Sequence, residues 1–408
     1  MIGKIKIAFC SLLFTLNVAG QEVSSTDTTA VDSVKTKYTL IDRLHQVQQF
    51  LDRRAKRRVD PNYIEVPDKP WRVILRYKAN AVDVEYRDIF TYPIGDAFTE
   101  WKLYFKPPMA SSIGFWVGYR GTGVSYSKAL NGNAGRYFSI TSSGARYGFN
   151  FRLRRFNTSD ASLTATDYEN GASLGTSVDT TGILYSPVWI RSVYINGYYV
   201  FNGRRYSQAA AYNQSVIQRR SAGSFLLGAT WYQSSFDYSD VSNAVFMLLG
   251  HGVHRIKVHQ ANIGFGYGYN FVPCRGLVIN AMVMPTLSVY NRVKAYKYDF
   301  NYDLSVEDDV DDYGQWNSET KTWANGKTHK SIFMANEETD DAEYWDLPSE
   351  TAYSAFHLNV DLRVGIAYNW KNWFLSAQGQ YNNFSYKKDE NRVNISDGYF
   401  QVSLGVRL

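Results

Sequence analysis

The chain has 408 residues and a net charge of +6; 20% of its residues are charged and 16% are aromatic. So mild a positive charge gives no reason to expect a nucleic-acid partner. Mean hydropathy is −0.34, and beyond the first twenty residues no stretch is apolar for the roughly 20 residues that a membrane helix needs. These properties exclude an all-helical membrane protein but suit a transmembrane β-barrel, in which apolar and polar residues alternate.

Residues 1–20 have the features of a secretory signal peptide. Lys4 and Lys6 precede a short apolar run, and small residues end it, so we expect cleavage after Gly20. Loss of the signal leaves Cys274 as the sole cysteine, so the mature chain is expected to form no intramolecular disulfide.

A polar leader and a helix are expected next. Residues 21–37 have the composition of a disordered leader. Between 38 and 60, apolar residues recur at helical spacing and are followed by a basic cluster, which predicts an amphipathic basic helix in the periplasm. Three placements stay open: on the anionic inner leaflet, in the barrel mouth, or packed on the periplasmic rim, which we favour.

From residue 70 to 408 the apolar period is two, in segments long enough to cross a membrane as tilted strands. A change of parity near Asn80 and Ala81 predicts a bulge in the first strand. Ten strands are expected, near 71–86, 111–128, 135–157, 188–202, 221–235, 256–272, 276–296, 353–369, 372–386 and 397–408. The alternative count is twelve, if residues 204–220 form a hairpin and not an inward-folded turn.

The connections predict the orientation. Short turns alternate with long connections at 87–110, 157–187, 236–255 and 297–352, the last being the longest. Short periplasmic turns and long external loops are typical of outer-membrane barrels. The fold class is therefore all-β, an antiparallel up-and-down transmembrane barrel in the outer membrane of a Gram-negative cell. A soluble barrel with its apolar face inward is the alternative.

Expected partners follow from this placement. Outer-membrane lipid would surround the barrel, and the barrel assembly machinery would read the last strand, which ends flush with the chain at Leu408.

Three stretches carry a family resemblance. They are DPNYIEVPDKPWRV at 60–73, YYVFNGRRYSQAAAYNQSVIQRRSAGSFLLGATW at 198–231 and FGYGYNF at 265–271. They resemble an uncharacterised exported family, domain of unknown function 4421. The resemblance implies an outer-membrane barrel and brings no activity or functional residue.

The polar face of the expected strands carries a surplus of cations. The lumen-facing candidates are Arg72, Arg76, Lys78, Arg152, Arg154, Asp361 and Arg363. Arg120, Arg191 and Arg407 are expected on the same face, with Asp83 and Glu85 as acidic partners. Such a surplus favours an anion-selective passage or an anionic ligand, such as a lipid head group. A narrow lumen plugged by ion pairs is the simpler interpretation, and the one we favour.

Other candidate sites lie in the expected loops. The aromatic candidates for contact with a partner, a sugar or the membrane rim are Trp316, Trp323, Tyr344 and Trp345. His251, His254 and His259 are weak metal candidates, because their spacing matches no zinc pattern and their side chains would diverge in a strand. No metal or cofactor is therefore expected.

The function expected from the sequence is that of an outer-membrane binding or structural protein. A narrow anion-selective channel and a lipid-modifying enzyme are the alternatives. The enzyme is the less favoured alternative, because the spacing of serines and histidines in one sequence does not show a catalytic triad.

Overall fold

The computed structural model describes residues 40–408 apart from 57–58, 92–95, 107–108, 131–134, 182–183, 244–245, 248–251, 298–315, 318–321, 324–349, 355 and 389–390. The chain divides into two units, residues 1–46 and residues 47–408. The expected signal peptide and leader lie outside the described residues. Among the described residues, no helix is both long enough and apolar enough to cross a membrane.

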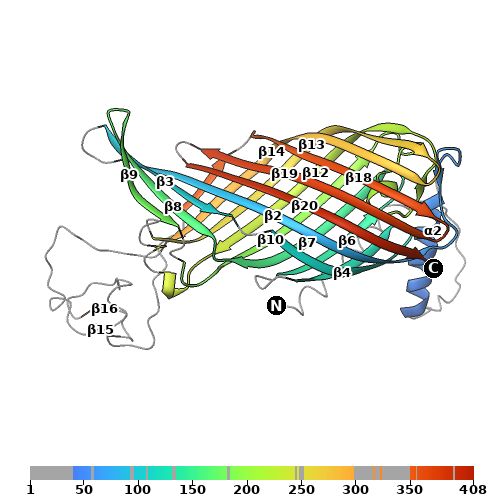
Figure 1. Cartoon of the computed structure of the whole chain (residues 1–408), viewed down its shortest axis with the longest axis horizontal. Helices are drawn as coiled ribbons and strands as arrows, with labels where there is room; N and C mark the ends of the chain where they lie inside the picture. Colours follow the sequence, from blue (N-terminus) through green and yellow to red (C-terminus); the bar gives the residue numbers. More distant parts are fainter. Residues whose placement is uncertain are drawn as a thin grey trace, which may run out of the picture. The chain divides into compact units, whose positions relative to one another are not determined.

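The second unit is built on a closed antiparallel β-barrel (Figure 1). Twelve strands follow one another around it in chain order, and the last pairs with the first. They are β2 (Trp71–Thr91), β4 (Ala110–Tyr119), β5 (Thr122–Ala129), β6 (Arg136–Ser143), β7 (Tyr147–Thr158), β10 (Val188–Val200), β12 (Ala222–Asp237), β13 (Val253–Cys274), β14 (Leu277–Lys297), β18 (Leu358–Trp370), β19 (Trp373–Lys388) and β20 (Asn391–Arg407).

The expected count of ten is two short, because two of the expected strands are hairpins. The segment 111–128 turns at Arg120 and Gly121, both of which have positive φ. The segment 135–157 turns between Ser143 and Tyr147. In both segments the outward-facing residues change from one parity to the other across the turn. That change of parity is the sequence signal of a hairpin.

The predicted bulge in β2 is wrong. The pairing of β2 with β20 continues from Arg72 to Arg87 without a register shift. The alternation continues unbroken, with Leu75 facing outward and Val82 facing inward. The apolar residues change parity because the inner face of the strand becomes apolar beyond Asn80. Consequently Asp83 and Glu85 lie on the outer face and are not partners for lumenal cations.

Two of the connections expected as external loops contain strands. β3 (Ala97–Phe105), β8 (Ala161–Glu169) and β9 (Ala172–Thr181) form a sheet that continues from β2, since β3 pairs with Val84–Thr91. This sheet extends beyond the end of the barrel opposite to the chain's C-terminus (Figure 1).

The longest expected loop also contains short strands. β15 (Trp316–Asn317) pairs with β16 (Thr322–Trp323), and β17 (Glu350–Ser354) pairs with β14.

The two faces of the barrel wall differ in polarity. In β13, Ile263, Phe265, Tyr267, Tyr269 and Phe271 are exposed on the outside, as the alternation predicted, and Phe265 is 53% exposed. The glycines between them face inward. One of these, Gly268, is required by close packing, because a Cβ there would lie 2.3 Å from the hydroxyl oxygen of Tyr206.

One helix contacts a rim of the barrel. α2 (Leu40–Lys56) places Asp52 where its carboxylate accepts hydrogen bonds from Tyr119 (2.8 Å) and Arg120 (2.6 Å). Arg54 donates to the Ser142 hydroxyl at 3.0 Å. Residues 52–54 are therefore held against the turns that join β4 to β5 and β6 to β7.

Candidate functional site

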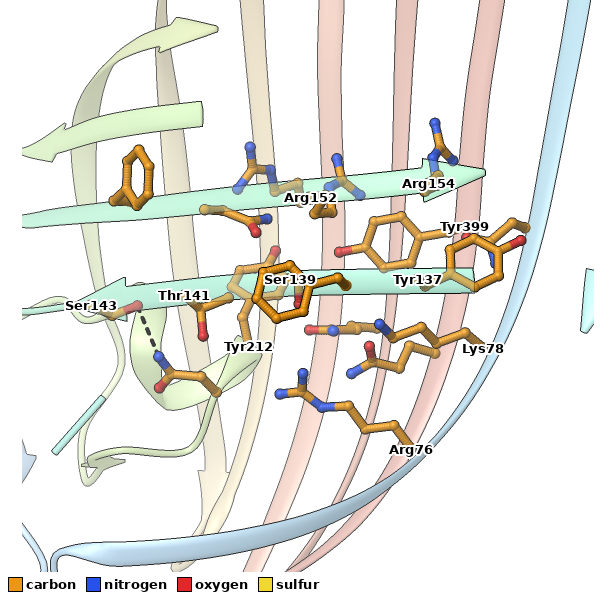
Figure 2. Close-up of a pocket in the computed structure, with 18 of the residues that line it drawn as sticks. Arg76, Lys78, Tyr137, Ser139, Thr141, Ser143, Arg152, Arg154, Tyr212 and Tyr399 are labelled. Carbon is orange, nitrogen blue, oxygen red and sulfur yellow. Dashed lines mark hydrogen bonds between the residues drawn. The ribbon is translucent and has the colours of Figure 1, made fainter. Parts of the chain in front are cut away.

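A polar cavity of about 100 Å³ lies inside the barrel. Its walls come from β2, β6, β7, β10, β18, β19 and β20, and part of its lining comes from residues 208–213. Figure 2 shows Arg76 and Lys78 reaching into it from β2, and Arg152 and Arg154 from β7. The side chains of each pair are two residues apart, so both point to the same face of their strand.

Two of the lining cations have acidic partners. Arg154 donates two parallel hydrogen bonds to the carboxylate of Asp397, at 2.7 and 2.5 Å. Arg363 binds Asp361 at 3.0 and 2.5 Å and also donates to the Asn196 amide oxygen at 3.0 Å. Charge-assisted hydrogen bonds of this bidentate kind are strong and fix the geometry of both groups.

The other three lining cations make no ion pair with any described residue. These cations are Arg76, Lys78 and Arg152. The Arg152 guanidinium lies 3.9 Å from the ring centroid of Tyr194, and its Nε and Nη2 have no hydrogen-bond partner in the described part of the chain. The Arg76 guanidinium lies 5.3 Å from the ring of Trp116. Aromatic rings stabilise a cation but do not cancel its charge.

The segment 201–220 closes one side of the cavity. It folds inward and contains α3 (Gln208–Tyr212), in which Ala209, Ala210 and Ala211 are buried. β11 (Ile217–Gln218), near its end, pairs with β1 (Ile64–Glu65). The expected inward-folded turn is therefore what the structure has at 204–220, and no barrel hairpin forms there.

Barrel side chains fix this segment in place. The Tyr212 hydroxyl donates to Asn280 at 2.5 Å, and the Asn213 amide donates to Ser143 at 2.8 Å (Figure 2). Arg72 donates to the carbonyl of Asn213, and Arg407 donates to that of Gln214 at 3.1 Å. Arg72 thus faces the lumen, as predicted, but holds the inward-folded segment and does not line the cavity.

An apolar cluster fills the lumen toward the opposite end of the barrel. Phe105 stacks on Phe236 with ring centroids 6.0 Å apart, and Tyr232 stacks on Phe384 at 4.2 Å. Valines and isoleucines of the neighbouring strands complete this buried cluster. In the described part of the barrel, side chains therefore occupy the lumen on both sides of the cavity.

The structure brings most of the predicted lumenal residues together. Arg76, Lys78, Arg152, Arg154 and Arg363 all line the cavity, and Asp361 contacts Arg363 beside it.

Two further predicted cations lie elsewhere. Arg191 faces outward on β10, so its placement on the lumenal face was wrong. Arg120 lies in a turn and binds Asp52.

The sequence interpretation missed Asp397, which is the acid that pairs with Arg154. Its parity in β20 is that of Arg407, which was expected on the polar face, so extending the alternation backwards would have found it. Tyr212 was missed because it reaches the cavity from the inward-folded segment, whose path the alternation does not determine.

The remaining candidates do not form a site in the described residues. His254 is buried on the inner face of β13, His259 lies on its outer face, and His251 is not among the described residues. Trp316 and Trp323 are directly paired in β15 and β16, while Tyr344 and Trp345 lie outside the described residues. Among the described residues, no group of three or more His, Cys, Asp or Glu side chains is placed to hold a metal ion.

Fold and cavity together define a closed antiparallel β-barrel with a cationic chamber in its lumen. The chain belongs to the family described as domain of unknown function (DUF4421), whose family model matches residues 58–407. This match confirms the resemblance seen in the sequence. No curated protein matches the chain significantly.

Several solved barrels are similar to the chain at low identity. The β domain of the Bordetella autotransporter BrkA is 9% identical, with 83% of this chain and 100% of that chain covered and a TM-score of 0.29. The outer membrane protease OmpT from Escherichia coli is 6% identical, with 84% and 97% covered and a TM-score of 0.34. The Pseudomonas putida toluene transporter TodX is 8% identical, with 84% and 90% covered and a TM-score of 0.27. Likenesses of this degree assign no activity to the chain.

Proposed function

We propose that this protein is an outer-membrane β-barrel that binds a compact anion inside its lumen. The observation that carries the proposal is the set of three cavity cations, Arg76, Lys78 and Arg152, that have no acidic partner among the described residues. Removing cations from water without a counter-charge is unfavourable, and a bound anion would offset that cost.

The outer surface supports the membrane placement. Large apolar side chains face outward on most strands of the barrel. For example, the exposed fraction is 59% for Val364 on β18 and 53% for Phe265 on β13. A soluble barrel would bury such side chains, whereas here they are exposed and the inner face around the cavity carries asparagines, glutamines and arginines. The expected signal peptide agrees with export to the outer membrane.

The size and donors of the cavity favour a small oxyanion. Its volume of about 100 Å³ has room for several water molecules or for an ion of the size of phosphate. Guanidinium groups present several N–H donors to such an ion, and the Lys78 ammonium adds a point charge. The lining residues include no histidine or carboxylate among those described, which favours binding over acid–base catalysis.

Thermal unfolding tests the proposal. A ligand that binds only the folded state raises the unfolding midpoint as its concentration rises. We expect phosphate to raise the midpoint of the purified barrel more than chloride does at equal ionic strength. Arg152→Gln should abolish this difference, whereas Arg392→Gln, which removes a cation from the outer face of β20, should preserve it. Equal effects of phosphate and chloride on the unsubstituted protein would contradict the proposal.

A narrow anion-selective channel is the second candidate function. It is favoured by one observation: a single inward-folded segment, 201–220, separates the cavity from one end of the barrel. Displacement of that segment alone would not open a path, because the apolar cluster fills the other side. Current steps in a planar bilayer that reverse at the anion equilibrium potential would favour the channel over the binding protein.

A further inference from the structure

Four cations lie directly opposite one another on the outer wall of the barrel. Lys128 of β5 pairs with Arg136 of β6, Arg136 with Arg155 of β7, and Arg155 with Arg191 of β10. All four side chains are exposed. Neighbouring strands are about 4.8 Å apart, so this cation ladder places four positive charges within roughly 15 Å.

The ladder has no acidic partner in the described part of the protein. None of its four side chains forms an ion pair with a described residue. Like charges placed directly opposite each other destabilise a sheet. Four adjacent cations without a counter-charge therefore destabilise the sheet unless an anion from outside the chain binds to them.

Elsewhere on the same outer wall, the chain supplies its own counter-charge. Arg87 of β2 lies directly opposite Lys102 of β3, and Glu100 forms ion pairs with both. Arg87 also lies opposite Arg392 of β20, which lies opposite Lys387 of β19, so this row too has four cations. Glu100 neutralises part of the charge of that row, whereas the cation ladder has no acid among the described residues. The contrast indicates that the anion of the ladder comes from a partner.

The position of the ladder identifies the kind of partner. The same four strands also carry an apolar row, paired in the same order. Each residue of this row lies two positions from the ladder residue of its strand, toward the barrel end at which the chain's C-terminus lies. This row consists of Tyr126, Phe138, Leu153 and Val193. The ladder thus lies about 7 Å beyond apolar side chains, at the edge of the band assigned to the bilayer.

An aromatic side chain supports this boundary. The Arg155 guanidinium lies 4.4 Å from the ring centroid of Trp189, which is outward-facing on β10. Tryptophan is enriched where a barrel wall passes from hydrocarbon to lipid head groups.

We propose that the cation ladder binds the phosphate groups of lipids in the outward-facing leaflet. Guanidinium groups at this level would meet head groups, and two or more adjacent cations would bind a lipid that carries several phosphates better than one that carries none. The proposal rests on the membrane placement given above and is independent of the anion in the lumen.

Native mass spectrometry of the purified full barrel in a non-ionic detergent tests this site. The probes are bisphosphorylated lipid A and the same lipid with its phosphates removed. We expect the unsubstituted protein to retain the phosphorylated lipid in preference, and Arg136→Gln/Arg155→Gln to lower that retention about tenfold, which corresponds to about 1.4 kcal/mol. The matched control Arg87→Gln/Lys102→Gln also removes two opposed outer cations and should retain the lipid normally. Arg136→Lys/Arg155→Lys keeps the charges and should retain most of the binding.

Three results would overturn the proposal: undiminished retention by Arg136→Gln/Arg155→Gln, equal retention of the dephosphorylated lipid, or an equal loss in the control pair. Every variant is first checked for a boiling-dependent gel shift, and the single substitution Arg191→Gln replaces the double variant if the latter does not fold. A different result would overturn the membrane placement: recovery of the unsubstituted chain as a soluble protein. The lumenal site fails separately, if Arg152→Gln does not change the response to phosphate.

Discussion

The guanidinium of Arg154 and the carboxylate of Asp397 meet inside the barrel through two hydrogen bonds of 2.7 and 2.5 Å, although 243 positions separate them in the sequence. Both side chains are almost completely buried. This contact links β7 to β20 across the lumen and neutralises one of the five cations around the cavity.

Loss of the Asp397 charge should destabilise the barrel strongly. Asp397→Asn would leave Arg154 buried without a counter-charge, and breaking a buried ion pair from one side costs about 3–5 kcal/mol. Urea unfolding followed by tryptophan fluorescence measures the change. Asp83→Asn removes a carboxylate from the outer face and should change the free energy of unfolding by about 0.5 kcal/mol or less. Similar effects of the two substitutions would show that the buried pair does not stabilise the barrel.

A carboxylate built into the cavity should replace the proposed anion. Gln378 lines the cavity, and its Oε1 has no hydrogen-bond partner among the described residues. Gln378→Glu keeps the shape of the side chain and adds a negative charge beside unpaired cations. We expect it to raise the free energy of unfolding without anion by about 1–3 kcal/mol and to remove the response to phosphate. If Gln378→Glu destabilises the protein and leaves the phosphate response intact, the cavity cations do not need a negative counter-charge, which contradicts the proposed anion site.

A side chain larger than that of glycine at position 268 should destabilise the packing of the inward-folded segment. A Cβ in Gly268→Ala would clash with the buried hydroxyl of Tyr206, and such overpacking costs about 1–3 kcal/mol. Gly197→Ala is the control, because a Cβ there has nothing within 4 Å. Adding Tyr206→Phe to Gly268→Ala removes the clashing oxygen and should recover part of the loss in thermal unfolding. A Gly268→Ala protein as stable as the Gly197→Ala protein would contradict the observed packing.

The contact of α2 with the rim should protect the helix from proteolysis. Asp52→Asn removes the charge that binds Arg120, a partly exposed pair worth about 0.2–1 kcal/mol. Limited trypsin digestion should therefore cleave after Arg53, Arg54 and Lys56 a few times faster in this variant. Glu65→Gln, which breaks the exposed pair with Arg219, should leave that cleavage rate unchanged. Equal rates in all three proteins would mean that Asp52 does not hold the helix.

The wall of the barrel could be predicted from the sequence because each strand has an apolar and a polar face. The alternation from Ile263 to Phe271 gave the correct faces of β13, and the lumenal assignment of Arg76, Lys78 and Arg152 followed from the same rule. The rule failed where the environment changes along a strand. Beyond Asn80 the apolar residues of β2 face the lumenal cluster, so a change of environment was interpreted as a bulge.

Contacts across the lumen could not be predicted in the same way. The hydrogen bond from Tyr212 to Asn280 and the pairing of Arg154 with Asp397 join residues brought together only when the barrel closes. Alternation determines which face a residue occupies but not which residue lies opposite it inside the barrel. The two hairpins at Arg120–Gly121 and between Ser143 and Tyr147 were detectable, because parity changes at both turns.

The most direct test of the central claim is a crystal structure of the barrel grown with selenate, with anomalous data collected at the selenium edge. Selenate has the charge and shape of a phosphate-like oxyanion, and its position is observed independently of the protein coordinates. We predict an anomalous peak in the cavity within hydrogen-bonding distance of Arg76, Lys78 or Arg152. An anomalous map with peaks on the outer surface and none in the cavity would contradict the claim that the lumen binds a compact anion.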